Sequence, residues 1–352
     1  MSDAARARDF CQRFGLRHPI LLAPMAGACP VPLSAAVAEA GGMGACGALL
    51  LTPPAILDWA KEFRAATQGP FQINLWLPDP PPTRDAAHEA RVREFLGRFG
   101  PAVPAEAGDA RPLDFAAQCE ALLAARPAMV SSIMGVYPPD YVKKLKAAGI
   151  AWMANATTVA EARAAEAAGA DVIVAQGMEA GGHRGAFNAS EAEGAQVGLF
   201  ALLPGIVDAV KLPVVATGGI ADARGVAAAF ALGASAVQVG TGFLRTPEAA
   251  LPKAWADELG RAAPEDAVIT RGFSGRAGRA LANRYVRAVA AADAPRPAPY
   301  PVQRGLSAGM RQDAIKANDL DRMQAWAGQS ARLAPALPAR EVFARLLAGV
   351  PA

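Results

Sequence analysis

The first 245 residues alternate short apolar runs with alanine-rich segments of helical character. Short apolar runs predict buried strands, and alanine-rich segments between them predict helices. Because parallel strands need a crossover connection, this alternation predicts an α/β fold, a (β/α)₈ TIM barrel. Strands are expected at 19–25, 41–46, 71–76, 129–134, 150–155, 171–176, 213–217 and 236–240.

An open, doubly wound sheet is the alternative fold for the same alternation. Such sheets often bind dinucleotides through a GxGxxG turn after the first strand, followed at a distance by an acidic residue. The first strand here leads into APMAG at 23–27, which lacks that pattern. The barrel is therefore the favoured fold.

Two segments interrupt or follow the regular alternation. A proline-rich segment at 78–112, with a charged helical piece at 85–99, predicts an insertion after the third strand, where specificity elements commonly lie. Residues 246–352 follow the barrel of residues 1–245 as a C-terminal extension expected to cover the barrel and its site. Other helices are expected at 33–40, 53–66, 115–125, 139–148, 159–168, 202–210, 223–232 and from about 340.

Composition and charge exclude several classes of protein. Apolar residues make up 53% and charged residues 19% of the 352 residues, which is a globular composition. Thirty-five basic residues nearly cancel thirty-two acidic ones, and no long basic run is present, so no nucleic-acid partner is expected. The four cysteines lack CxxC spacing, which fits buried thiols in a reducing compartment better than disulfides or a metal site.

The N-terminal sequence and the uncharged runs bear on localisation. MSDAARARDF lacks the apolar stretch of a signal peptide. The uncharged run at 20–38 contains three prolines, and the run at 225–244 contains glycines and polar residues, so neither predicts a membrane span. We therefore expect a cytoplasmic protein without a membrane partner.

The stretch QGMEAGGHRG at 176–185 follows the sixth expected strand and carries one of only three histidines. Glycines allow the backbone to approach a ligand closely, and a histidine can exchange a proton near neutral pH. We interpret His183 as a candidate catalytic residue, with a plain surface turn as the alternative. For Glu179 and Arg184 in the same stretch, a salt bridge or loop anchor competes with a catalytic role.

Glycine turns follow the seventh and eighth expected strands, at Thr217-Gly218-Gly219 and Gly240-Thr241-Gly242. In barrels, the loops after these two strands commonly bind phosphate through backbone N–H groups. The two turns together predict a phosphate site, although ordinary helix-cap glycines remain the alternative.

An apolar shelf and isolated amides extend this candidate site. Small apolar residues at 23–27 directly after the first strand suit a flat ring. Asn74 and Gln176 place amides near the ends of two other strands, where each needs a hydrogen-bonding partner. Phosphate site, shelf and amides together outline a phosphorylated planar cofactor, and FMN fits this outline.

These stretches resemble the nitronate monooxygenase family, formerly called 2-nitropropane dioxygenase, in its class I form. The histidine stretch is shared in part with flavin-dependent enoyl-acyl-carrier-protein reductases, so the C-terminal extension matters in choosing between the two. The similar stretches are APMAG at 23–27, AGGMG at 40–44, QINLW at 72–76, QGMEAGGHRG at 176–185, ATGGIAD at 216–222, QVGTGFL at 238–244, RALANRY at 279–285 and WAGQSARL at 326–333.

The resemblance implies a barrel that binds FMN, uses no metal and oxidises alkyl nitronates such as propionate 3-nitronate with dioxygen. The products would be a carbonyl compound and nitrogen oxyanions, and His183 would be the catalytic base. The expected FMN contacts are Asn74, Gln176, Gly181, Gly218, Gln238, Gly240 and Thr241, joined by Ala23, Pro24, Met25, Gly182, Gly219 and Val239 from the same stretches.

Tyr300 and Arg304 in the extension are the expected substrate contacts. A phenol and a guanidinium suit a carboxylate-bearing nitronate. The family places a tyrosine and a basic residue, often lysine, with similar spacing here, so the arginine is a departure from its pattern. The chain is expected to act on small molecules as a monomer or homodimer.

Two other functions remain open at this point. An NAD(P)H-dependent flavin reductase, acting on a quinone or an enoyl thioester, would use the same barrel and histidine stretch. A barrel that binds a phosphorylated ligand without catalysis is the third possibility.

Overall fold

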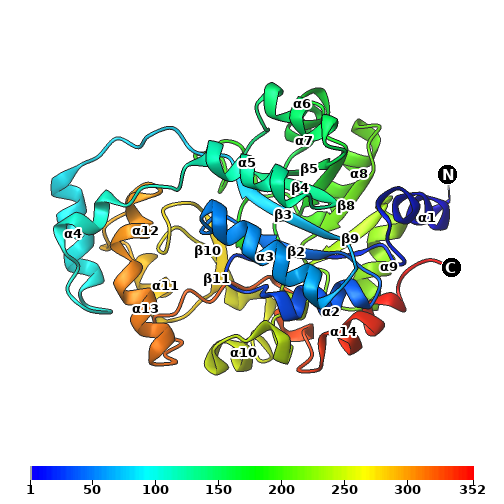
Figure 1. Cartoon of the computed structure of the whole chain (residues 1–352). Helices are drawn as coiled ribbons and strands as arrows, with labels where there is room; N and C mark the ends of the chain where they lie inside the picture. Colours follow the sequence, from blue (N-terminus) through cyan, green and yellow to red (C-terminus); the bar gives the residue numbers. More distant parts are fainter. Residues whose placement is uncertain (1) are drawn as a thin grey trace.

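Eight parallel strands form a barrel in the computed structural model, which describes residues 2–352 (Figure 1). The strands follow one another around the sheet in the order β1-β9-β8-β6-β5-β4-β3-β2. The N–H of Leu22 donates to the carbonyl of Met43 at 2.9 Å, which joins β1 to the start of β2 and closes the ring. The strands are β1 (Ile20–Leu22), β2 (Gly44–Gly47), β3 (Phe71–Trp76), β4 (Met129–Ile133), β5 (Ala151–Ala156), β6 (Val172–Gln176), β8 (Val214–Thr217) and β9 (Ala236–Val239). The predicted TIM barrel is confirmed.

Crossover helices lie outside the ring of strands and begin where the sequence supplies caps. The hydroxyl of Thr52 accepts from the N–H of Ala55 at 3.4 Å, and Pro53 fits the first turn because its missing N–H would be unpaired there. These crossover helices are α2 (Val31–Glu39), α3 (Pro53–Ala66), α5 (Phe115–Ala125), α6 (Pro139–Ala147), α7 (Val159–Ala167), α8 (Leu199–Ala209) and α9 (Ala223–Ala231).

The last helix of the chain, α14 (Ala339–Leu347), completes the helical layer of the barrel. It packs against α2, α9 and β1, between the first and last crossover helices (Figure 1). Its apolar residues Val342, Phe343 and Leu346 are at most 2% exposed and belong to the same core cluster as the strands. The C-terminal extension therefore supplies the helix that would otherwise follow β9.

An N-terminal helix that the sequence analysis did not predict, α1 (Asp3–Phe14), packs onto the barrel interior. The side chain of Ser2 caps α1, and Gly15 ends it with a left-handed φ of 68°. Phe10, 1% exposed, belongs to a cluster with Leu21, Met129, Met153 and other inward-facing strand residues. Burying a side chain of this size stabilises the fold by about 1.5–3 kcal/mol.

The segment after β3 lies beside the C-terminal extension (Figure 1). It contains α4 (Ala86–Leu96) and the short 3₁₀ helix η1 (Ala105–Asp109), which pack against α12 (Val302–Leu306). The extension also contains α10 (Lys253–Leu259), α11 (Arg284–Val289) and α13 (Ala308–Lys316), and the 3₁₀ turns η3 (Pro247–Ala249), η4 (Pro264–Asp266) and η5 (Ala331–Leu333). A further 3₁₀ turn, η2 (Thr241–Phe243), directly follows β9.

A small antiparallel sheet joins the histidine stretch to the extension. It consists of β7 (Gly182–His183), β10 (Ala267–Thr270) and β11 (Gly278–Leu281), with β11 in the middle. In its register, His183 is paired with Gly278. The sequence analysis placed His183 in a loop after the sixth strand, whereas the structure places it on a strand whose partner comes from the extension.

Two further properties concern the chain as a whole. All four cysteines are buried and free, as the sequence predicts. Among residues 2–352, no helix combines the length and the apolar character needed to cross a membrane. The division at residue 245 stays a prediction.

Candidate active site

Three predicted amides meet at the carboxyl ends of the barrel strands, where TIM barrels place their active sites. Asn74, Gln176 and Gln238 are each 7% exposed. The Asn74 amide donates to the hydroxyl of Ser131 at 3.0 Å, and Gln238 Oε1 accepts from Gln72 Nε2 at 3.0 Å. The amides of Asn74 and Gln238 are therefore held in fixed orientations by side chains from other strands.

His183 is enclosed by two tryptophan rings and a serine hydroxyl. The centroid of its ring lies 4.6 Å from that of Trp76 and 4.8 Å from that of Trp326, both in edge contacts. Its Nε2 lies 2.7 Å from Ser274 Oγ. Trp76 ends β3, whereas Ser274 and Trp326 belong to the extension, so barrel and extension build this pocket jointly.

The surroundings of His183 disfavour its charged form. Burial is the largest cause, and the positive charges of Arg276, Arg304 and Arg311 add to it, so that the pKa of His183 falls from 6.5 to about 3. The residue keeps some solvent-accessible surface, but its ring atoms are closely surrounded. The imidazole is therefore neutral at pH 7 and has a lone pair available to accept a proton.

Gln176 fixes the histidine stretch from the end of β6. Its Oε1 accepts from the N–H of Gly185 at 2.8 Å, and its Nε2 donates to the carbonyl of His183 at 3.1 Å. Both ends of its amide are thus bonded to the main chain on either side of Arg184. Gln176 holds the position of His183, and its predicted cofactor contact stays a prediction.

Glu179 and Arg184 anchor the same stretch. The carboxylate of Glu179 accepts from the N–H of Leu199, at 2.9 and 3.0 Å from its two oxygens, which caps the start of α8. Arg184 is 1% exposed, and its Nη1 donates to the carbonyl of Gly177 at 2.7 Å. Burial, with the charge of Arg279, lowers the pKa of Arg184 to about 10. The structure thus supports the loop-anchor interpretation for both residues.

Tyr300 and Arg304 reach the same pocket from the extension. The Tyr300 ring centroid lies 5.7 Å from that of Trp76, which also contacts His183. Burial raises the pKa of Tyr300, while the charge of Arg304 opposes this shift. Among residues 2–352, the guanidinium of Arg304 forms no ion pair and donates no hydrogen bond. Arg304 thus keeps its donors available for an anion.

The two predicted glycine turns and the histidine stretch converge. Gly218 has a φ of 108°, and a side chain on it would lie 3.1 Å from the N atom of Ala180. A side chain on Gly181 would lie 2.5 Å from the N atom of Gly328 and 3.0 Å from Thr241 Oγ1. These positions require glycine because three loops meet there.

Several main-chain donors at these turns are free. Within residues 2–352, the N–H groups of Gly218, Gly219 and Gly240 donate to no protein acceptor. A side chain built on Gly182, which has a φ of 75°, would meet no atom within 4 Å. Free N–H groups at strand ends are what a phosphate-bearing ligand requires.

The first loop lies next to the second glycine turn. A side chain on Gly240 would lie 3.3 Å from both the Cβ of Ala23 and the sulfur of Met25. The N–H of Ala23 donates to the carbonyl of Val239 at 2.9 Å. Pro24, between Ala23 and Met25, is partly exposed. The predicted shelf therefore borders the predicted phosphate site.

Several residues of the pocket escaped the sequence analysis. Trp76 and Trp326 lie in stretches that carry the family resemblance, and their large rings were a usable signal. Ser274 and Arg276 lie in a stretch with no such signal, because their role depends on a tertiary contact with β7. Arg311, whose pKa is lowered by burial and by Arg304 to about 10, is a further charged group near the histidine.

Comparisons with known proteins agree over nearly the whole chain. A family model described as nitronate monooxygenase matches residues 9–349. The nitronate monooxygenase of Paraburkholderia phytofirmans is 37% identical to the chain, and the match covers 98% of the chain and 96% of that protein. The nitronate monooxygenase of Pseudomonas aeruginosa is also 37% identical, and the match covers 96% of the chain and 97% of that protein. The solved nitroalkane oxidase from Streptomyces ansochromogenes is 37% identical, with a TM-score of 0.86 and 97% of both chains covered. The solved structure of FabK from Thermotoga maritima is 29% identical, with a TM-score of 0.76. That match covers 96% of this chain and 94% of FabK.

Fold and comparisons together define an oxidoreductase enzyme built on a TIM barrel. The family match covers nearly all of the chain, including the extension that contributes Ser274, Tyr300 and Trp326 to the pocket. The chain belongs to the nitronate monooxygenase family.

Proposed function

We propose that this protein binds FMN at the barrel mouth and oxidises alkyl nitronates, such as propionate 3-nitronate, with dioxygen. A carbonyl compound and nitrogen oxyanions are the products. The observation that carries this proposal is a neutral histidine in a pocket that also holds Arg304, whose charge has no acidic partner among residues 2–352. A pocket of this kind favours an anionic substrate and can take a proton from a neutral one.

The residues at the strand ends fit FMN. The free N–H groups of Gly218, Gly219 and Gly240 suit its phosphate, and Thr241 adds a hydroxyl beside them. The apolar shelf of Ala23, Pro24 and Met25 suits the flat ring, and Asn74 and Gln238 offer amides for its polar edge. Gln176, Gly181, Gly182 and Val239 complete the proposed contacts. When bound, FMN supplies the electron transfer between nitronate and dioxygen.

His183 and its neighbours would act on the substrate directly. A neutral nitroalkane must lose the proton on the carbon that bears the nitro group, and the neutral imidazole of His183 accepts that proton. Arg304 and Tyr300 would bind a carboxylate on the substrate through charge-assisted hydrogen bonds. Trp76 and Trp326 flank the imidazole on two sides, which limits water near the reacting carbon.

A flavin reductase that uses NAD(P)H is the second candidate. The resemblance of the histidine stretch to flavin-dependent enoyl-acyl-carrier-protein reductases supports it, and FabK from Thermotoga maritima shares the fold. The extension argues for nitronate oxidation, since it carries Tyr300 and Arg304 and lies within the family match.

Purification followed by oxygen uptake tests the proposal. We expect a yellow protein that releases FMN on heating and consumes dioxygen with propionate 3-nitronate. A flavin-bearing protein that consumes no oxygen with any nitronate, but oxidises NADH in the presence of a quinone, would favour the reductase. A colourless protein that gains no activity when FMN is added would contradict both.

A further inference from the structure

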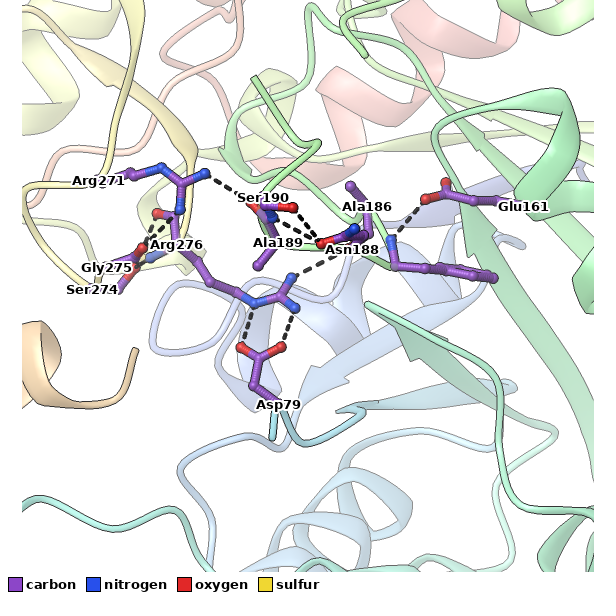
Figure 2. A network of polar contacts seen from close by, with 11 residues as sticks. Asp79, Glu161, Ala186, Asn188, Ala189, Ser190, Arg271, Ser274, Gly275 and Arg276 are labelled. Atoms are coloured by element: carbon purple, nitrogen blue, oxygen red, sulfur yellow. Dashed lines mark hydrogen bonds and ion pairs between the residues drawn. The ribbon is translucent and has the colours of Figure 1, made fainter. Parts of the chain in front are cut away.

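A buried ion pair connects the segment after β3 to the extension. Nε of Arg276 lies 2.7 Å from Oδ2 of Asp79, and Nη2 of the same guanidinium donates to Oδ1. Figure 2 shows the guanidinium of Arg276 facing the carboxylate of Asp79. The side chain of Arg276 is only 3% exposed, and that of Asp79 is 21% exposed. Two parallel bonds to one carboxylate fix the orientation of the guanidinium as well as its position.

Arg276 reaches the histidine stretch by two routes. Its Nη1 donates to the carbonyl of Ala186 at 3.3 Å, a residue close behind His183 in the chain (Figure 2). Its backbone N–H donates to Oγ of Ser274 at 3.2 Å, and that hydroxyl lies 2.7 Å from Nε2 of His183. A continuous series of polar contacts thus runs from Asp79 to the imidazole.

The other hydrogen bonds of the histidine stretch hold its main chain, whereas the series of contacts from Asp79 ends at the imidazole. Glu161 accepts from the N–H of Phe187 at 2.7 Å, and Gln176 accepts from that of Gly185, so the main chain is held from the barrel side. The contacts through Ser274 and Arg276 come from the extension and reach the imidazole itself. Barrel contacts and the pairing with β11 hold the main chain, whereas Ser274, itself held by Arg276, bonds the imidazole.

Charge adds a second link between the pair and the histidine. Arg276, Arg304 and Arg311 are the cations that act on His183, and Tyr300 is the other titratable group of the pocket. Arg276 is the cation with an acidic partner, Asp79, whereas Arg304 and Arg311 form no ion pair within residues 2–352. The negative charge of Asp79 thus lies directly on one of the three cations that act on the imidazole.

We propose that Asp79 is a positioning residue for His183, which it orients through Arg276 and Ser274. The proposal rests on the proposed function of His183 as a base, and it gives the segment after β3 a part in that reaction. Asp79 is not one of the residues proposed to contact the substrate or FMN. Because a base must lie within hydrogen-bond reach of the proton that it abstracts, a small rotation of the imidazole lowers the rate.

Asp79→Asn tests the proposal. With nitroethane as substrate, we expect kcat to fall about 10-fold or more while KM stays within about twofold, because proton abstraction and not binding is impaired. Asp79→Glu should recover part of the loss. The matched control is Asp109→Asn, which removes another ion pair of the same segment, 3.1 Å from Arg84, and should leave kcat unchanged.

A double-mutant cycle asks whether Asp79 acts through Arg276. If it does, Asp79→Asn combined with Arg276→Gln is no slower than Arg276→Gln alone. Losses that multiply in the double variant would show two independent effects and would overturn the proposed route.

Ring ¹⁵N spectra of labelled histidine give a readout independent of turnover, because the chain has only three histidines. In the FMN-loaded protein, Asp79→Asn should shift or broaden the His183 signals, and Asp109→Asn should not. Arg276→Gln should move the acid titration of His183 to higher pH, because one cation that lowers its pKa is removed. Asp79→Asn should move the acid titration of His183 to lower pH, because the negative charge beside Arg276 is removed.

The two proposals fail in different ways. If the unmodified protein oxidises no nitronate, the proposed function fails. If it oxidises nitronates but not nitroethane, the role of His183 as a base fails. In both cases the ¹⁵N spectra still report on the imidazole. If it oxidises nitroethane, and Asp79→Asn matches it in both kcat and spectra, the positioning role is wrong. Should Asp79→Asn not fold, Arg276→Lys keeps both charges but loses the two parallel bonds to Asp79, and normal His183 spectra in that variant would equally overturn the proposal.

Discussion

Nε2 of His183 lies 2.7 Å from the hydroxyl oxygen of Ser274, a residue that is 1% exposed. Because Nε2 is engaged by Ser274, Nδ1 is the ring nitrogen that we propose accepts the substrate proton. The same hydroxyl accepts from the N–H of Arg276 at 3.2 Å, so its own position is fixed. Ser274 thereby orients the ring.

Ser274→Ala should reduce the rate of proton abstraction without loss of FMN. We expect kcat for nitroethane to fall about 10-fold, because the imidazole loses a fixed orientation. Ser190→Ala is the matched control, since its hydroxyl bonds to Asn188 on the surface. Steady-state kinetics with the neutral substrate nitroethane and with its anion, ethyl nitronate, measure the effect. An unchanged kcat would show that Ser274 does not orient the base.

His183→Ala separates proton abstraction from the later oxidation. The variant should keep FMN, because the proposed phosphate site lies at the turns after β8 and β9. It should lose about 100-fold or more of its activity on neutral nitroethane and much less on preformed ethyl nitronate. Equal losses on the two substrates would mean that His183 orients or stabilises the substrate and does not remove its proton.

Arg304→Gln tests the carboxylate contact. A hydrogen bond to a charged group contributes about 1.5–3 kcal/mol, so KM for propionate 3-nitronate should rise about 10- to 100-fold. Ethyl nitronate lacks the carboxylate, and its KM should change far less. Arg332→Gln, at an exposed position of the extension, serves as the control. A similar rise for both nitronates would place Arg304 away from the carboxylate.

The low pKa of His183 predicts a loss of stability in acid. The folded protein keeps His183 neutral down to about pH 3, whereas the unfolded chain takes up a proton near 6.5. Below pH 6.5 the unfolded state therefore binds an extra proton, and this term lowers the free energy of unfolding by at most about 1.4 kcal/mol per pH unit. Well above pH 6.5 His183 is neutral in both states, so it no longer contributes to the pH dependence of the free energy of unfolding.

Urea unfolding between pH 7.5 and 5 measures this term. His183→Gln should lose stability less steeply than the unmodified protein as the pH falls. His88→Gln, on α4 away from the pocket, should follow the unmodified protein. Parallel curves for His183→Gln and the unmodified protein would show that His183 titrates normally in the folded state.

The sequence predicts those elements whose causes are local. The strands of the barrel follow from apolar runs, and α3 begins where Thr52 and Pro53 predict. The N-terminal helix α1, although not among the predicted elements, also has a local signal, because Ser2 caps its start and Gly15 ends it.

The missed parts of the site depend on contacts between distant segments. β7 is two residues long and contains a glycine, so only its pairing with β11 makes it a strand. Asp79 and Arg276 are 197 residues apart, and no local pattern relates them. The cytoplasmic location and the monomeric or dimeric state stay predictions.

Anaerobic spectroscopy tests the central proposal most directly. The purified, FMN-loaded protein is mixed without oxygen with propionate 3-nitronate and, in separate samples, with NADH and NADPH, and the visible absorption is recorded. Nitronate oxidation predicts that the flavin spectrum changes with the nitronate and not with either nicotinamide. Rapid bleaching by NADH alone, with no change on adding the nitronate, would contradict it.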